Sequence, residues 1–506
     1  MTNDRGAALV TVLILIVVLT AIGVAMVNLE LTEITTAYNQ SDAMAARTAA
    51  EAGIARAIYE LGNNATWPGV TTAIGDGQYQ VTVTSSGTVR VIQSVGTRGG
   101  GRRQLQAAVK ALPPFTLYAV LANTTATLGS GNSGVTIRNA LPSASAGAVQ
   151  ANNRLGAGTA ITANTAGATI VGAVTANGAI TGIACGTWPW TCTQASGVVP
   201  VPRLDVDSAA ATSYKSRAMS AVDPVDGLNL YLHGGDATSR CMSGGAWTFD
   251  AAHTQQCWDK YISDRNGVIG AGMAGAVFFV EFNNGELTRY RIRVPPPQPN
   301  RTVDCAGYSG LVETLCIRAS PATDDTGAVV YPNSALNQVT GTIVAFRRVG
   351  GGTTVVGDIA LENLSLRSAG SAICGDYCHV SLGGDPAFLA ARQFLVTSTG
   401  AAAAQRKVTI RGVLYTLAGL DNPDGSNNLQ GASAPGITIQ HGADLVALVL
   451  EGLLMSNGSI TIQKSAVNAG TVAVEYESAV TDVLPTAFLN ATTTRTILLI
   501  SWSSGD

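Results

Sequence analysis

The chain has 506 residues, of which 12% are charged, 6% are aromatic and 57 are glycine. This composition argues against an ordinary globular enzyme and suits short strands joined by tight turns. The net charge of −3 excludes a general electrostatic attraction to nucleic acid and leaves room only for local basic patches.

Residues 7–27 carry no charge, and the apolar pattern then continues at helical spacing to about Leu61. This pattern predicts one long helix over 7–61 that is apolar first and amphipathic afterwards. At about 1.5 Å per residue, the uncharged part is about 30 Å long, enough to cross a bilayer core. In the second half, Ile54, Ile58 and Leu61 share a face, which we expect to pack on a sheet.

The leader before the apolar run is short, its charges cancel, and the small residues precede the run, unlike the arrangement in a secretory signal peptide. Arg5, Gly6, the apolar run, Glu30, Glu33 and the stretch 49–53 together resemble the N-terminal region of PilX-type minor pilins of type IV pili. The resemblance implies that residues 1–6 are a prepilin leader, that a membrane peptidase cleaves after Gly6, and that Ala7 is then methylated. The simpler alternative is that 7–27 is only a single-pass anchor.

Most pilins carry Glu at the fifth mature position, which is Thr11 in this chain. A carboxylate in hydrocarbon costs several kcal/mol unless it is paired, so that Glu is kept where a partner amine exists. In related systems the subunit that lacks this Glu caps the filament tip. Thr11 therefore favours a tip or priming position.

Three segments after the helix alternate apolar and polar residues, at 77–84, 89–95 and 103–109, with turn residues between them. Period-two alternation with glycine turns predicts an antiparallel meander within residues 62–122. The apolar C-terminal segment 491–506 needs a sheet to join, and we expect it to return to this meander.

Short apolar triplets recur over 123–185 and 336–490, and the sequence Ile-Thr-Ile-Gln occurs twice, at 437–440 and 460–463. A repeat of about 20 to 30 residues with small residues at the corners is typical of a β-solenoid. The predicted fold class is therefore α+β and mostly β, with a long N-terminal α-helix, a pilin-type antiparallel sheet and a large inserted β-solenoid.

The repeat is interrupted over residues 186–335. Six of the eight cysteines fall in or at the edge of this interval. We therefore expect a mostly β region here that disulfides hold together and that extends from the solenoid. Close sequence neighbours give the expected pairs, because short loops close most readily. The chain has an even number of cysteines and a predicted export signal, which indicates disulfides formed outside the cytoplasm. Zinc ligands are the alternative, but the closely paired cysteines of a zinc ribbon are missing from the sequence. The expected disulfides are Cys185–Cys192, Cys241–Cys257, Cys305–Cys316 and Cys374–Cys378.

No nucleotide-binding, serine hydrolase or zinc protease motif is present, and we expect no enzyme activity, cofactor or metal. A calcium loop at 421–425 is the weaker alternative to a turn, because its spacing differs from that of an EF-hand. Arg289, Arg291 and Arg293 alternate along one predicted strand, with Arg301 close by, and offer a phosphate-contacting face. A solvated strand face is the alternative interpretation, and it applies equally to Arg98, Arg102 and Arg103.

The sequence thus predicts a non-enzymatic minor pilin, held in the inner membrane before assembly and then placed in an extracellular pilus, at or near its tip. The expected partners are the prepilin peptidase, the major and other minor pilins, and DNA or a surface, as in competence pilins or adhesive pilins. The alternatives are the tip pseudopilin of a type II secretion system and a membrane-anchored surface enzyme or adhesin.

If Gly6–Ala7 is the cleavage junction, mass spectrometry of protein from a host with the peptidase should find Ala7 N-terminal and methylated. An intact Met1 in that host would contradict the pilin interpretation.

Overall fold

The computed structural model describes most of the chain. It describes residues 4–64, 66–86, 89–112, 114–130, 135–139, 147–156, 158–164, 168–183, 190–194, 197–243, 253–273, 275–292, 297–305, 311–318, 321–350, 354–362, 377–380, 385–397, 406–417, 436–441, 445–464, 471–476, 488–489 and 496–505. The chain forms two compact units, Met1–Leu112 with Thr493–Asp506, and Pro113–Thr492. Most of the described elements are strands, so the fold is α+β, as the sequence predicts.

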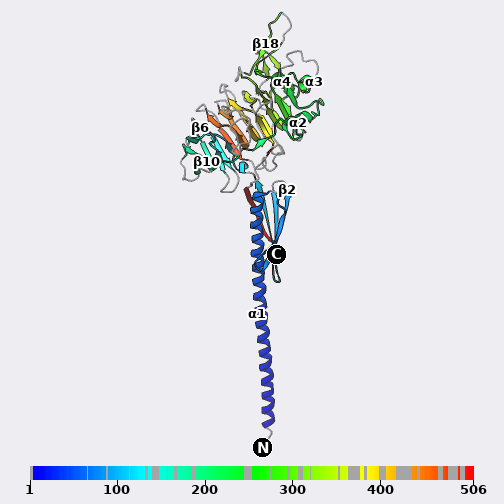
Figure 1. The fold of residues 1–506 in the computed structure, drawn as a ribbon, viewed down its shortest axis with the longest axis vertical. Helices are drawn as coiled ribbons and strands as arrows, with labels where there is room; N and C mark the ends of the chain where they lie inside the picture. Colours follow the sequence, from blue (N-terminus) through cyan, green and yellow to red (C-terminus); the bar gives the residue numbers. More distant parts are fainter. Residues whose placement is uncertain are drawn as a thin grey trace. The chain divides into compact units, whose positions relative to one another are not determined.

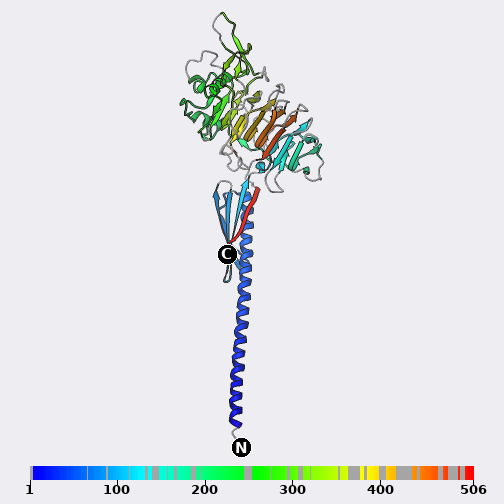
Figure 2. The ribbon, with the colours of Figure 1, turned by 180° about the vertical axis from the view of Figure 1, so that it is seen from behind.

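The first unit consists of one long helix and one antiparallel sheet. Helix α1 spans Asp4–Asn63, and the sheet has the strand order β1-β2-β3-β4-β36. Figures 1 and 2 show the first half of α1 extending beyond this sheet, while its second half lies against it. The strands are β1 (Gly69–Ile74), β2 (Gly77–Ser86), β3 (Val89–Arg98), β4 (Gly101–Leu112) and β36 (Thr496–Gly505).

Helix α1 packs on the sheet through small residues. Ala50, Ile54, Ala57 and Leu61 are buried against sheet residues such as Ile92. At the closest approach, a Cβ added at Gly96 would lie 1.9 Å from the Ala46 carbonyl oxygen and 2.6 Å from the Ala50 nitrogen. The helix can therefore approach β3 this closely only because position 96 has no side chain.

The three alternating segments of the sequence form β2, β3 and β4, and β36 pairs antiparallel with β4 along most of its length. Strand β1 was not expected, because Trp67-Pro68-Gly69 indicates a turn and the residues after it do not alternate. In the structure, five of the six β1 residues are exposed and the strand pairs with β2 at the edge of the sheet.

The second unit is built on two large sheets in which every pairing between described strands is parallel. The strands of the 15-stranded sheet are β5 (Val120–Ala122), β7 (Val135–Asn139), β8 (Gly147–Ala151), β10 (Ala168–Ala176), β12 (Trp190–Gln194), β14 (Tyr231–His233), β15 (Val268–Ile269), β16 (Val277–Glu281), β22 (Gln338–Thr340), β23 (Thr342–Ala345), β27 (Tyr377–Val380), β28 (Pro386–Ala390), β30 (Arg406–Thr416), β32 (Leu445–Ser456) and β34 (Thr471–Tyr476).

The second large sheet has eight strands, and smaller elements complete the unit. Its strands are β6 (Ala126–Ser130), β9 (Thr159–Ala163), β11 (Ala179–Thr181), β19 (Thr314–Arg318), β26 (Asp358–Glu362), β29 (Gln393–Thr397), β31 (Gly436–His441) and β33 (Ile460–Lys464). Four two-stranded pairs are β13 (Arg203–Leu204) with β35 (Phe488–Leu489), β17 (Tyr290–Ile292) with β18 (Arg301–Val303), β20 (Ala322–Thr323) with β21 (Val329–Tyr331), and β24 (Arg347–Arg348) with β25 (Val355–Val356). The helices are η1 (Pro114–Leu117), α2 (Tyr214–Ser220), α3 (Arg240–Ser243) and α4 (Thr254–Asp264).

A ladder of backbone hydrogen bonds follows the strand ends of the 15-stranded sheet. In each step, the N–H of the residue just after one strand donates to a carbonyl at the end of the neighbouring strand, at 2.8 to 3.1 Å. The steps are Phe346 to Val280, Ala391 to Ala345, Leu417 to Ala390, Asn457 to Thr416, Asn123 to Ser456, Asn152 to Ala122 and Asn177 to Ala151. The early segment of the unit therefore stacks directly on its last segment.

The pairing is more complex than the plain stack of coils predicted from the repeat. Strand β32 pairs with β34 through its first half and with β5 through its second, so that β32, β34, β7, β10, β8 and β5 close into a ring of six parallel strands. The change of partner falls at Gly452, whose φ of 151° suits glycine. The two Ile-Thr-Ile-Gln copies do pair in register, Ile437 with Ile460 and Ile439 with Ile462.

The interval 186–335 contains helices that the sequence does not predict, alongside more numerous strand residues. It contains α2, α3 and α4, and its strands β14, β16 and β19 belong to the two large sheets. The periodicity of the flanking repeat is absent there because helices and short paired strands separate the sheet strands. The chain divides after Leu112 and after Thr492, so residues 113–122, which the sequence assigns to the meander, belong to the second unit.

Replacing Gly96 by Ala should destabilise the first unit by about 1 to 3 kcal/mol, because the new methyl group overlaps the backbone of α1. Gly100 is the matched control, since a Cβ there meets nothing within 4 Å. Its replacement by Ala should change stability by less than about 0.5 kcal/mol. Denaturant unfolding of the full chain in detergent measures both, and equal stabilities of the two variants would contradict the packing account.

Candidate functional site

The apolar half of α1 is the largest exposed apolar surface of the first unit. Large side chains from Leu9 to Leu31 are mostly half exposed or more, for example Leu13 at 60% and Val17 at 59%. Among the described residues, α1 alone is long and apolar enough to cross a membrane on length and composition, and none of its most apolar stretch is buried. Exposed apolar surface of this extent marks a site of contact with membrane or protein.

The residues expected to govern processing and position lie at the start of this helix. Gly6 and Ala7 are in the first turns of α1. Thr11 is exposed on the helix a little more than one turn further on. The structure thus places the three on one continuous helix and leaves their proposed roles as predictions.

Two of the four expected disulfides are described. Cys241 of α3 is bonded to Cys257 of α4, and Cys305 is bonded to Cys316 of β19. Cys192 is also disulfide-bonded, but Cys185 and Cys374 lie outside the described residues, as does the side chain of Cys378. The described bonds therefore join α3 to α4 and hold residue 305 against the eight-stranded sheet.

Two of the four predicted arginines, Arg289 and Arg301, are paired with aspartates. Arg289 donates to Asp304 at 2.7 and 3.0 Å, and Arg301 donates to Asp324 at 2.9 Å. Arg291 is exposed on β17, while Arg293 lies outside the described residues. The described strand β17 alternates in burial, and aspartates on nearby segments offset the charges of Arg289 and Arg301.

The opposite face of β17 is buried in a polar network. Tyr290 donates its hydroxyl to Asp259 at 3.0 Å, and Arg318 donates to the same carboxylate at 3.2 and 3.3 Å. Burial raises the pKa of Asp259, and the Arg318 charge opposes this rise. The network joins α4, β17 and β19, so this region serves to hold the elaboration together.

The basic hairpin of the first unit is also partly neutralised, since Arg98 donates to Asp76 at 3.2 Å. Among the described residues, no group of His, Cys, Asp and Glu is placed to hold a metal ion. The expected turn at 421–425 lies outside the described residues. A calcium site there is therefore not addressed by the structure.

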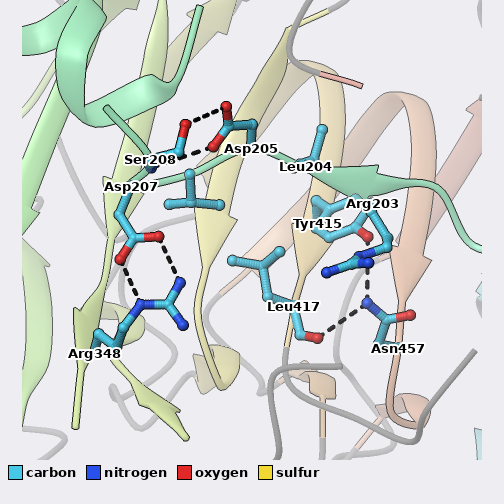
Figure 3. Close-up of a pocket in the computed structure, with 10 residues that line it drawn as sticks. Arg203, Leu204, Asp205, Asp207, Ser208, Arg348, Tyr415, Leu417 and Asn457 are labelled. Carbon is cyan, nitrogen blue, oxygen red and sulfur yellow. Dashed lines mark hydrogen bonds and ion pairs between the residues drawn. The ribbon is translucent and has the colours of Figure 1, made fainter. Parts of the chain in front are cut away.

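The second unit has a cleft that sequence reasoning missed. It has a volume of about 150 Å³ and lies between the segment 203–208 and residues at the ends of the sheet strands (Figure 3). Its lining comes from segments far apart in sequence, so no local motif announces it. The lining residues are Arg203, Leu204, Asp205, Val206, Asp207, Ser208, Arg348, Tyr415, Leu417 and Asn457.

Most charged groups of this cleft are paired within it. Asp207 accepts two hydrogen bonds from Arg348, at 2.6 and 2.7 Å, and Asp205 accepts from the hydroxyl and backbone N–H of Ser208 (Figure 3). The Tyr415 hydroxyl donates to the Pro202 carbonyl, which ties the segment to the sheet. Hydrogen bonds between the lining residues therefore fix the polar groups of the cleft in place.

Comparison with known proteins does not identify a family for this chain. No family model matches the chain, and no curated protein matches it. Among solved structures, the crystal structure of the competence-associated pilin ComZ from Thermus thermophilus aligns over 92% of this chain and 98% of that chain, at 12% identity and a TM-score of 0.19. A TM-score of this size does not establish a common fold.

The turn between β20 and β21 should make stability depend on pH. The Asp324 carboxylate accepts from the Thr326 hydroxyl at 2.6 Å, from Arg301, and from two backbone N–H groups, and these bonds hold its pKa well below the usual value. The stabilisation is full above the unfolded pKa of about 3.9 and is lost as the pH falls through the lowered folded pKa.

The difference in thermal midpoint between the wild type and Asp324→Asn should therefore be full at neutral pH and shrink below about pH 4. Asp264→Asn is the control, because Asp264 pairs with Lys260 on the exposed side of α4, and such pairs contribute little. A wild-type-to-variant difference that grows in acid would contradict this account.

Proposed function

We propose that this chain is a minor pilin of a type IV pilus, of the PilX type and similar in plan to competence minor pilins. The observation that carries the proposal is the exposed apolar half of α1, continuous with a second half that packs on an antiparallel sheet. An apolar helix of this length needs lipid or other apolar helices around it. A pilin meets both in turn, first in the inner membrane and then in the filament core.

The same helix supports the proposed partners. We propose that the prepilin peptidase cleaves after Gly6 and that Ala7 becomes the methylated N-terminus. Thr11 supplies no carboxylate for the amine of an incoming subunit, which favours few copies at or near the tip. The major pilin and other minor pilins would then contact α1 from the side.

The second unit is proposed as the part that meets the outside. We propose that its parallel sheets are the coils of a β-solenoid, an interpretation supported by the ladder of hydrogen bonds along the strand ends. We propose no enzymatic role for it. Its role would be contact with DNA, as in natural transformation, or with a surface, together with pilus priming.

A DNA contact would depend on fewer groups than the sequence indicates. Because Arg289 and Arg301 are paired with aspartates, Arg291 is the described arginine of that set best placed to reach a phosphate. Each phosphate contact contributes about one unit to the salt slope, so a site with one such cation would show a shallow salt dependence. Because two of these arginines are paired with aspartates, we favour contact with a surface over contact with DNA.

The pilus proposal is tested by photocrosslinking in a host that assembles pili. A photoreactive residue at Val17, which is 59% exposed on the apolar half of α1, should give adducts with pilins that depend on the assembly motor. Mass spectrometry of the adducts also distinguishes a pilin from the main alternative, a pseudopilin of a type II secretion system, because a pseudopilin would be linked to other pseudopilins.

The matched control is the same photoreactive residue at Val225, which is 70% exposed in the second unit. It should give no motor-dependent adduct with the major pilin. Absence of pilin adducts at Val17, or identical adducts without the motor, would show that the helix serves only as an anchor.

A further inference from the structure

Among the described charged groups of the cleft in Figure 3, Arg203 is the one whose side chain lacks a direct hydrogen bond or ion pair, and the cleft as a whole, with Arg203, Arg348, Asp205 and Asp207, is formally neutral. Asp207 is paired with Arg348, and Asp205 is engaged by Ser208, so neither carboxylate is paired with Arg203. Within the described part of the chain, the Arg203 guanidinium has no hydrogen-bond or ion-pair partner, although it is half-buried at the cleft wall. A half-buried cation without a partner is a ready site for an anion.

Arg203 lies close to the Tyr415 hydroxyl and to Asn457, as Figure 3 shows. Burial raises the pKa of Tyr415, and the Arg203 charge acts against that rise. The Tyr415 hydroxyl is held by the Pro202 carbonyl and by the Asn457 amide, at 3.3 Å for the latter. These bonds fix the polar wall beside Arg203 before any ligand arrives.

Asn457, beside Arg203 in the cleft lining, has a side-chain oxygen without a hydrogen-bond donor among the described residues. Its amide nitrogen donates to Tyr415 and, at 3.0 Å, to the Leu417 carbonyl, but its side-chain oxygen has no hydrogen-bond partner. The residue is only 6% exposed. An acceptor buried without a donor is costly.

We propose that this cleft binds an acidic sugar, with the sugar carboxylate on Arg203 and sugar hydroxyls on the polar groups around it. The planar guanidinium matches a carboxylate with two parallel hydrogen bonds. Leu204, Val206 and Leu417 supply apolar wall against which a sugar ring can lie. The volume of about 150 Å³ equals roughly five water molecules, which suits one sugar unit and not a nucleic acid duplex.

Such a site would give the second unit a specific partner, an acidic glycan, whether or not the chain is assembled in a pilus. The site is distinct from the arginine strand around Arg291, since it lies at the ends of the parallel strands. Recognition would require both the carboxylate and the hydroxyls, because Arg203 is the charged group left without a direct partner and the groups beside it, Tyr415 and Asn457, are uncharged.

The test uses ligand-observed NMR titration of the full chain in detergent with three probes. Glucuronate carries both features, acetate carries only the carboxylate, and glucose carries only the hydroxyls. Glucuronate should bind with a dissociation constant on the order of 1 mM, and acetate and glucose each at least about tenfold more weakly.

Arg203→Gln should weaken glucuronate binding by at least about tenfold, and Arg203→Lys should lose less because it keeps the charge. Arg138→Gln is the matched control, since Arg138 is exposed on β7, and it should leave binding unchanged. Unchanged thermal unfolding of Arg203→Gln shows that the fold is kept. The proposal fails if glucuronate does not bind, if acetate or glucose binds as tightly, or if Arg203→Gln binds like the wild type.

Discussion

The close packing of α1 on the antiparallel sheet is the interaction on which the first unit depends. Ala46 and Ala50 meet β3 where Gly96 leaves room for the helix backbone, and Ile54 and Leu61 fill the rest of the interface. This contact uses only the second half of the helix, so the apolar first half is left without protein around it. The hydrophobic effect then requires a membrane or neighbouring helices to cover that half, and the proposed filament subunit would meet both, whereas a simple anchor would meet only the membrane.

The sequence predicted the first unit well because its signals are local. A continuous apolar run and alternating segments specify α1, β2, β3 and β4 without reference to distant residues. Strand β1 was missed because it is exposed on both faces and so shows no alternation. The second unit is predicted from the sequence as a β-solenoid with a disulfide-stapled elaboration. The closed ring of strands is not predicted, since the pairing of β5 with β32 joins residues more than three hundred positions apart and nothing in either segment encodes it.

The candidate sites show the same limit. Alternation predicts that Arg289 and Arg291 share a face of one strand, but it could not show that Asp304 neutralises Arg289 from another segment. The cleft around Arg203 was invisible for a related reason: Arg348, Tyr415 and Asn457 reach it from three separate parts of the chain. Charge balance in this protein is set by tertiary structure, and a count of basic residues along a strand overstates what that strand offers to a partner.

The central claim is that the first half of α1 needs an apolar environment and contributes nothing to the packing of the first unit. Comparing the full chain with a chain that begins at Asn28 tests it directly. The full chain should stay with membranes after an alkaline wash, and the shortened chain should be soluble without detergent and unfold at the same temperature. A full chain that is released as a soluble monomer, or a shortened chain that no longer folds, would contradict the claim.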